Sequence, residues 1–463
     1  MSRPPLTPSL IPGWMLMFAA AIVFFTSSFD TFLSIDLGPN VRIAQLVALI
    51  LVAGALLTHR MGFSMEMPLG APWLLAWCAV QLAFVPVAVF WQKSLAYCVW
   101  LVLNIALSFA MVNLFAGNFV RLQTLLKLYL GSFVFAAGFG IVQFVLPIVG
   151  GPALLVEQWW LPGRVPRVNG FSFEPSYYAT YLIMGLVCLG SLRRSGISDF
   201  RTKTWTFAYL LIVVAMILCS SRIGIAFVIL ELAIQPVRRM ARVVRRPSMV
   251  LGFHFSGRKI LIAGACICLA CIGGIRAVDW LAENPGTVRV MLWGTGLLGT
   301  ASHSVDERQD HFDDTIQAIA DHPWMGSSLG GVTESVASYM GIKPQNFEET
   351  KRYEGQSVFA EVVVASGIPG SIPFFCFMAI YLAAPLQLAR TVPPFQSAWL
   401  RALVLALVFE WAILQFNQNI LRLYLWVHIA VLATVFAAVR RQYCEPEEPG
   451  PFVAGYGAPN LFA

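Results

Sequence analysis

Three arginines and one glutamate stand where polar stretches meet apolar ones, and their types suit the binding of phosphate. Arg164, Arg167 and Glu174 lie in the polar stretch 150–176, and Arg222 follows in Ser220-Ser221-Arg222-Ile223-Gly224. Guanidinium groups form paired hydrogen bonds with phosphate oxygens, so this set could hold a diphosphate. Two simpler interpretations stay open. Arg164, Arg167 and Glu174 could form only a structural ion-pair cluster, and Arg222 could simply reach a membrane interface.

The longest polar interval of the chain runs from Asp279 to Gln356. It contains 12 acidic and 5 basic residues, and so holds half of the 24 acidic residues of the protein. Within it, Phe312, Ile316 and Ile319 recur at helical spacing until Pro323. This pattern predicts an amphipathic helix that lies on a membrane face.

The composition indicates that transmembrane helices position the candidate site residues. The chain is 58% hydrophobic and 12% charged, with a mean hydropathy of +0.72. An ordinary soluble domain has about 25% charged residues, so the sequence predicts an all-α, polytopic membrane protein. About 20 apolar residues cross a bilayer. Twelve apolar segments are candidates for transmembrane helices: 11–29, 41–58, 72–90, 95–115, 125–149, 177–192, 204–221, 222–237, 259–277, 356–385, 396–416 and 418–439.

The distribution of lysine and arginine predicts the orientation. With both termini in the cytoplasm, most of the 31 basic residues, including the run Arg238–Arg246, lie on or near the inner side. The chain then divides into helices 1–9 (1–277), one large outward loop with the amphipathic helix (278–355), helices 10–12 (356–440) and a disordered cytoplasmic tail (441–463). The first span lacks a cleavage signal, and we expect it to be retained.

Several ionisable groups fall inside the predicted spans. Glu231, Glu361 and Glu410 are functional hypotheses because a charge in hydrocarbon is expensive, although Glu231 could equally be neutral and buried. Polar residues up to Arg422 also mark the last outward turn. The nine cysteines include none in the outward loop, so no disulfide framework is predicted. The sequence has no phosphate-binding loop with a Walker lysine, no H-E-x-x-H and no dinucleotide fingerprint.

Four short motifs, taken in order along the chain, resemble the O-antigen ligase and polysaccharide polymerase superfamily of bacterial inner-membrane glycosyltransferases. The likeness covers roughly residues 160–440. The motifs are Gly170-Phe171-Ser172-Phe173-Glu174-Pro175-Ser176, Ser220-Ser221-Arg222-Ile223-Gly224, the passage from Arg308 through His322-Pro323-Trp324-Met325-Gly326, and Gln356-Ser357 followed after nine residues by Gly367-Ile368-Pro369-Gly370.

The resemblance implies a reaction at the periplasmic face. An acceptor sugar hydroxyl displaces undecaprenyl diphosphate from a lipid-linked glycan, and arginines stabilise the departing diphosphate without a metal or cofactor. On this hypothesis Arg222 and Arg308 bind the diphosphate, and Arg164, Arg167 and Arg289 make secondary donor or glycan contacts. Glu174 activates the acceptor hydroxyl, and Glu361 is a further candidate in the site.

One departure from the family pattern favours a polymerase. Ligases have histidine where this chain has Gln356, and an amide cannot act as a general base. The base must then lie elsewhere, with Glu174, Glu354 and Glu361 as candidates, or the site works mainly by positioning. Together with the Glu174-Pro175 motif, this predicts a polymerase of O-antigen or exopolysaccharide repeat units rather than a ligase.

Two alternatives remain: an O-antigen ligase that transfers glycan to a lipid acceptor, and a transporter or flippase of lipid-linked glycan. The long outward connector after the ninth span and the lack of a visible internal repeat argue against a secondary transporter. The expected partners are the undecaprenyl-diphosphate-linked oligosaccharide, membrane lipid, and a chain-length regulator and export proteins. No nucleic acid is expected.

Overall fold

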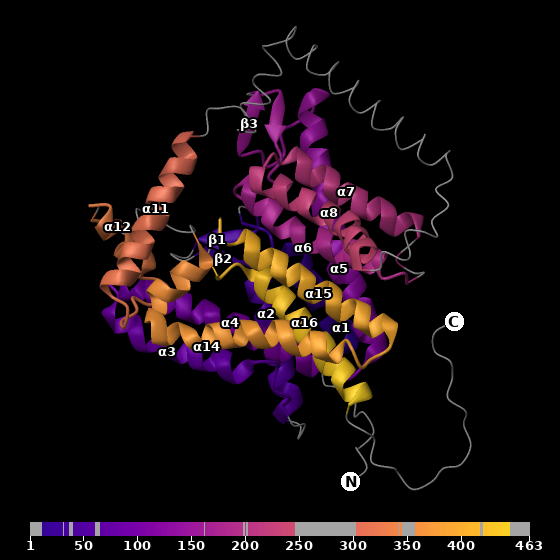
Figure 1. Ribbon diagram of the computed structural model, residues 1–463, viewed down its shortest axis with the longest axis horizontal. Coiled ribbons are helices and arrows are strands. Elements are labelled where there is room, and N and C mark those ends of the chain that lie inside the picture. Colours follow the sequence, from indigo (N-terminus) through magenta and orange to yellow (C-terminus); the bar gives the residue numbers. More distant parts are fainter. Residues whose placement is uncertain are drawn as a thin grey trace.

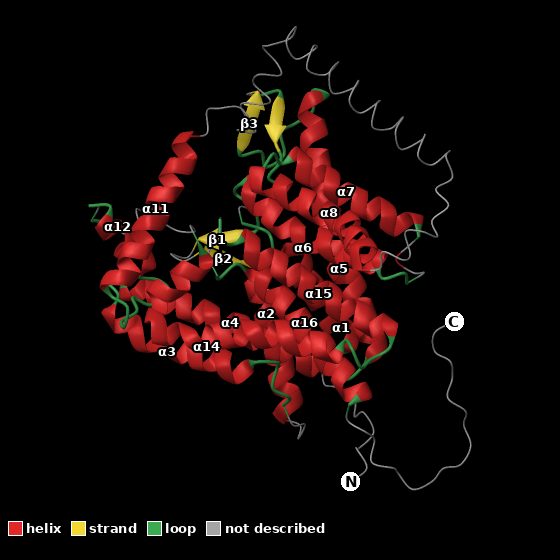
Figure 2. Cartoon of the chain, in the orientation of Figure 1, coloured by secondary structure: helices red, strands yellow, loops and turns green. Residues whose placement is uncertain are grey.

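The computed structural model describes residues 12–30, 32–36, 40–60, 65–161, 163–197, 200, 202–245, 302–341, 343–344, 357–416 and 420–444. Within these ranges the chain is mostly helical, with two short antiparallel hairpins (Figures 1 and 2). The predicted ninth span, the parts of the predicted loop at 278–301 and 345–356, and the tail from residue 445 lie outside the described residues.

The first half of the described chain contains eight α-helices, a short 3-10 helix and both hairpins. In chain order these are α1 (Gly13–Thr26), β1 (Ser34–Asp36), β2 (Asn40–Arg42), α2 (Ile43–Arg60), α3 (Ala71–Phe84), η1 (Val85–Val87), α4 (Trp91–Phe115), α5 (Phe119–Ile148), β3 (Gln158–Leu161), β4 (Val165–Arg167), α6 (Pro175–Arg194), α7 (Lys203–Leu218) and α8 (Arg222–Arg245).

The second half begins with the helices of the predicted loop. These loop helices are α11 (Ser302–Asp321) and α12 (Val332–Tyr339). Three long apolar helices follow: α14 (Val358–Leu388), α15 (Pro394–Ile413) and α16 (Leu423–Tyr443). Figure 1 shows α11 and α12 at one edge of the molecule, beside an end of α14.

Five of the described helices are long and apolar enough to cross a membrane, namely α4, α5, α14, α15 and α16. Apolar helices also cover the predicted spans at α1, α2, α3 and α7, but they are shorter. The prediction of a mostly helical chain with helices apolar enough to cross a membrane is confirmed. The count of twelve spans and their orientation remain predictions.

Helix α16 runs through the centre of the bundle. Its sequence is apolar on every side from Leu423 to Val439, and nearly all of these residues are buried. A helix that is apolar all round has no face for solvent, so other helices surround it. It packs mainly on α4 and α15, while α15 packs on α6 and α14 on α3. Small residues allow close approach: a Cβ at Gly185 of α6 would meet the ring of Phe133 of α5 at 2.4 Å.

The helix ends gather at two opposite ends of the bundle. At one end, Asp30 after α1 contacts Arg42 before α2 and Arg422 before α16. At the other end, Arg441 of α16 pairs with Glu66 before α3, and Arg194 of α6 pairs with Glu231 of α8. We call the end with Asp30 the site end, because the stretch 150–176 and the start of α8 also lie there.

Helix α14 is broken near its first third, and another segment fills the break. Gly367 has φ 68°, which only glycine adopts readily. The carbonyls of Val364 and Ala365 accept hydrogen bonds from the N–H groups of Ser327 and Ser328, at 3.1 and 2.9 Å. The break thus lets α14 bind the segment 323–328, which connects α11 to α12.

Candidate functional site

The stretch 150–176 is held against α5 by a buried amide. The Nε2 of Gln143 donates to the carbonyls of Leu154 and Leu155, at 2.8 and 3.0 Å. Its Oε1 accepts from the backbone N–H groups of Asn169 and Gly170, at 3.0 and 2.9 Å. Gln143 therefore joins the segments on both sides of the β3–β4 hairpin to one point on α5.

Arg167, Glu174 and Arg222 come together at the site end. Arg167 ends β4, Glu174 immediately precedes α6 and Arg222 begins α8. Burial lowers the pKa of the Arg167 guanidinium; the positive charge of Arg222 lowers it further, whereas the carboxylate of Glu174 raises it. Guanidinium groups nonetheless stay charged at neutral pH. The cluster thus combines two positive charges and one negative charge.

The Arg167 guanidinium is only partly satisfied by the protein. Its Nη1 donates to Oε1 of Gln158 across the hairpin, at 2.7 Å. Its Nε is buried and has no hydrogen-bond partner in the part of the chain that the structure describes. Leaving a buried charged donor unpaired is costly, and an anion at this point would remove that cost.

Local sequence explains why α8 begins at Arg222. Ser220 has φ 52°, a left-handed conformation that turns the chain sharply after α7. The hydroxyl of Ser221 then accepts from the N–H of Gly224, at 3.3 Å, and caps the new helix. A Cβ at Gly224 would lie 2.8 Å from Ala179 of α6, so glycine lets α8 start directly beside the first turns of α6.

The first turn of α6 is shaped by the Glu174-Pro175 pair. Pro175 occupies the first helical position, where the missing N–H has no cost. The carboxylate of Glu174 makes no cap hydrogen bond to the helix backbone; its Oε2 accepts from the hydroxyl of Ser176, at 3.0 Å. The carboxylate is half-buried beside the two arginines.

The structure separates the other predicted site residues from this cluster or does not describe them. Arg164 is exposed on the turn between β3 and β4. Arg308 lies in α11, where only the backbone is described. Arg289 and Gln356 fall outside the described residues.

Glu361 lies elsewhere at the site end, on a small pocket of about 20 Å³. Its other lining residues come from α4, from α12 and the segment before it, and from the turn before α16: Tyr97, Leu329, Val332, Thr333, Ile420 and Leu421. Next to it, Nζ of Lys93 donates to Oγ1 of Thr333, at 2.8 Å. Lys93 is 2% exposed, so a buried positive charge joins α4 to α12.

A further charged group contains residues to which the sequence analysis gave no role. One oxygen of Asp30 accepts from both Arg42 and Arg422, each at 2.8 Å. The guanidinium of Arg422 also lies over the ring of Tyr177, in the first turn of α6. The turn at 420–422 therefore connects the pocket at Glu361 with the helix end that carries Glu174.

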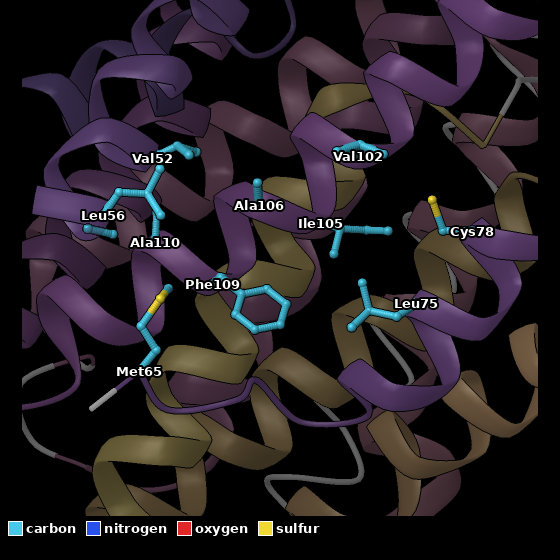
Figure 3. A pocket seen from close by; sticks show the side chains of 11 residues that line it. Val52, Leu56, Met65, Leu75, Cys78, Val102, Ile105, Ala106, Phe109 and Ala110 are labelled. Atoms are coloured by element: carbon cyan, nitrogen blue, oxygen red, sulfur yellow. The ribbon is translucent and has the colours of Figure 1, made fainter. Parts of the chain in front are cut away.

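A larger pocket lies between α2, α3 and α4 and is wholly apolar in character. It has a volume of about 230 Å³, and Figure 3 shows the side chains of Val52, Leu75, Val102 and Phe109 around it. It contains no group that could do acid–base chemistry, because Cys78 is its only lining residue with a titratable side chain. A hydrocarbon chain would fit its surface.

Among the described residues, no group of three histidine, cysteine, aspartate or glutamate side chains could hold a metal ion.

No protein-family model matches the chain, and no similar curated protein or solved structure is found.

Proposed function

We propose that the chain is a polymerase that joins undecaprenyl-diphosphate-linked oligosaccharide repeat units into a surface or exported polysaccharide. In this proposal the site end faces the periplasm and the protein is a multi-pass component of the bacterial inner membrane, with about twelve spans and cytoplasmic termini. The supporting observation is that Arg167 lies near enough to Glu174 and Arg222, which belong to other elements, for their charges to interact.

The chemistry follows from the charges in this cluster. Among the described residues, the guanidinium of Arg167 keeps a buried N–H unpaired. This unpaired, charged donor favours a bound anion. A diphosphate gains negative charge as its bond to the sugar breaks, so these arginines stabilise the transition state more than the bound substrate.

Glu174 completes the reaction as the general base. The acceptor hydroxyl attacks the anomeric carbon of the donor sugar, and its proton passes to the Glu174 carboxylate. The bond between that carbon and the diphosphate oxygen breaks, and its electrons leave with the lipid diphosphate. The Glu174 carboxylate is close enough to Arg167 for their charges to interact, and a base near the diphosphate-binding arginines could accept the proton of an acceptor bound there.

The proposal is tested with Arg167→Ala, Arg222→Ala and Glu174→Gln in cells that lack the native copy. We expect each variant to reach the membrane and to lose at least about a hundredfold of polymer, because a single transition-state contact of this kind contributes on that order. Arg390→Ala, an exposed arginine after α14 at the opposite end, is the matched control and should leave polymer unchanged.

The lipid-linked intermediate that accumulates when the protein is lost distinguishes a polymerase from a ligase or a flippase. Loss of a polymerase leaves single repeat units on the outer leaflet that are still transferred to their final acceptor. Loss of a ligase leaves full-length polymer on undecaprenyl diphosphate, and loss of a flippase leaves repeat units on the inner leaflet. Either of the last two results, or normal polymer from all three variants, would overturn the proposal.

A further inference from the structure

Glu410 is a carboxyl group buried between packed helices. It lies in the last turn of α15, on which α6, α8, α14 and α16 pack, and its side chain is fully buried. Both of its carboxyl oxygens lack a hydrogen-bond partner in the part of the chain that the structure describes. An ionised carboxylate is very costly in such a place, and a carboxyl group there takes up a proton instead. The unpaired oxygens of Glu410 therefore favour a bound proton.

Tyrosine side chains from neighbouring helices lie near Glu410. Tyr424, in the first turn of α16, and Tyr129 of α5 are close enough to interact with it electrostatically. The ring of Tyr181, from α6, meets the ring of Tyr424 edge-on, with 5.7 Å between their centroids. The ionisable side chains at the same end of α14 and α8 are Glu361 and Arg222. Tyr424 and Tyr129 are thus the groups through which a proton could reach Glu410.

Two further unpaired groups connect Glu410 with the site end. The hydroxyl of Tyr424 is buried and has no hydrogen-bond partner among the residues described. Tyr424 also interacts electrostatically with Asp30, whose Oδ2 is likewise buried and unpaired within the described chain. The Asp30 side chain is 6% exposed, so it lies just below the surface. Protons, or a water that carries them, would pair with Glu410, Tyr424 and Asp30 in turn.

On its inner side this row of groups ends at His428. The Tyr129 hydroxyl lies 2.6 Å from Nδ1 of His428, and Nε2 of the same ring lies 2.9 Å from the carbonyl oxygen of Leu403. A carbonyl oxygen only accepts, so Nε2 carries a hydrogen, and Nδ1 of the neutral ring then accepts from Tyr129. Both hydrogens are held in hydrogen bonds. Tyr129 and His428 therefore close the inner side to proton transfer.

We propose that Glu410 is a proton-binding site that exchanges its proton with the site end through Tyr424 and Asp30. A proton delivered at Asp30 binds the oxygen of Tyr424 while the hydroxyl hydrogen of Tyr424 passes to Glu410, so the tyrosine ends uncharged. The reverse sequence releases the proton. This site is separate from the cluster of Arg167, Glu174 and Arg222, and the inference does not rest on the proposed function.

Infrared spectroscopy on the purified full chain, in nanodiscs of uncharged lipid, tests the proposal. A protonated carboxyl group has a C=O stretching band that a carboxylate lacks, and this band shifts when deuterium replaces the hydrogen. At neutral pH we expect such a band from the native chain, its loss in Glu410→Gln and its retention in Glu410→Asp. In D2O the band should shift. Tyr424→Phe lacks the relay hydroxyl and should slow that shift about a hundredfold.

Matched controls separate this role from a structural one. Tyr443→Phe removes a hydroxyl at the opposite end of α16, where it accepts from Gln396 at 3.0 Å, and should exchange at the native rate. Glu231→Gln removes a carboxylate that is paired with Arg194, so the C=O band should stay unchanged. Glu410→Gln and Tyr424→Phe nearly keep the native shapes, and both should retain the native melting temperature.

A second measurement tests whether the site opens only toward the site end. Liposomes that contain the native chain and a pH-sensitive dye should leak protons no faster than liposomes with Glu410→Gln. Faster leakage with the native chain would overturn the closed inner side. Replacement of sodium by a large organic cation should leave the C=O band unchanged, and a band seen only without sodium would show a cation site instead.

Three infrared results would also overturn the inference. The first is a native spectrum in which Glu410→Gln loses no C=O band, which would mean an ionised Glu410. The second is a band that does not shift in D2O, which would mean a sealed acid. The third is equal exchange in Tyr424→Phe and the native chain, which would place the route elsewhere.

Discussion

The guanidinium of Arg422 lies over the ring of Tyr177, with 4.3 Å between the guanidinium carbon and the ring centroid. Arg422 precedes α16 and Tyr177 belongs to the first turn of α6, so one contact joins the central helix of the bundle to the helix that carries Glu174. A cation over an aromatic face contributes about 0.5–2 kcal/mol, depending on how far it is removed from water.

Two replacements of Tyr177 distinguish the contribution of the aromatic ring from that of the hydroxyl. Tyr177→Phe keeps the aromatic face, whereas Tyr177→Leu removes it. We expect the leucine variant to unfold about 0.5–2 kcal/mol more easily than the phenylalanine variant and to make less polymer. Chemical denaturation in detergent and polymer gels measure the two effects. Equal stability and equal polymer in both variants would show that the contact has no energetic role.

Gly326 is the most sensitive position in the segment bound by α14. A Cβ there would lie 2.2 Å from the carbonyl oxygen of Ala365, which belongs to the helix backbone and cannot move aside alone. Gly326→Ala should destabilise the fold by about 1–3 kcal/mol and release the α11–α12 segment to limited proteolysis.

Gly138 is the matched control for that substitution. It lies within α5, and a Cβ there would meet only Leu211, at 3.9 Å. Gly138→Ala should be neutral or stabilising by up to about 1 kcal/mol, because alanine favours helix. If the two variants show the same melting temperature and the same cleavage pattern, the packing described at Gly326 is wrong.

Glu231 is predicted to have a structural role at the end opposite the site. It is fully buried, pairs with Arg194 and accepts a hydrogen bond from the Tyr209 hydroxyl, which joins α6, α7 and α8. Glu231→Ala leaves Arg194 without its carboxylate and should cost about 3–5 kcal/mol. The double variant Glu231→Leu/Arg194→Leu removes both charges and should recover most of that loss, with polymer restored. Stable double-variant protein without polymer would instead assign Glu231 a catalytic or transport role.

The link between α11 and α12 should weaken in alkaline solution. Burial, followed by the hydrogen bond and negative charge of Asp321, raises the pKa of the Tyr339 phenol. A group whose pKa is raised on folding stabilises the fold fully below its unfolded pKa of about 10, and that stabilisation is lost as the pH rises through the folded value. Tyr339→Phe should cost about 1 kcal/mol at neutral pH and remove this alkaline loss. Limited proteolysis of the α11–α12 segment across the pH range measures the loss of stability at neutral pH and the alkaline loss. An identical alkaline profile in the variant would show that Tyr339 does not cause the alkaline loss.

The sequence predicted the positions of the helices better than their internal breaks and packing partners. Apolar length alone located α4, α5, α14, α15 and α16, because crossing hydrocarbon requires such runs. It could not show the break at Gly367. A glycine in an apolar run is common in membrane helices, and the partner that fills the break, Ser327 and Ser328, comes from a distant polar segment.

The sequence predicted site residues only where they belong to a short local motif. The Glu174-Pro175 and Ser220–Gly224 motifs pointed to Glu174 and Arg222, and the structure brings both to Arg167. The grouping of Asp30 with Arg42 and Arg422 was not predictable. These residues belong to the first connector, the start of α2 and the last turn, and no local pattern relates them. Gln143, a single amide within an apolar run, anchors both sides of the β3–β4 hairpin, and nothing in its local sequence indicates that role.

The filled break in α14 also bears on how the protein is made. The carbonyls of Val364 and Ala365 have no donor within α14, because the N–H of Ile368 bonds Pro323 and Pro369 has no N–H, so they depend on the 323–328 segment, which leaves the ribosome first. The segment can bind α14 only after residues 364–368 have been synthesised. Closure of this part of the bundle is therefore a late step of biogenesis, and a chain truncated within α14 would leave the loop unseated and open to quality-control proteases.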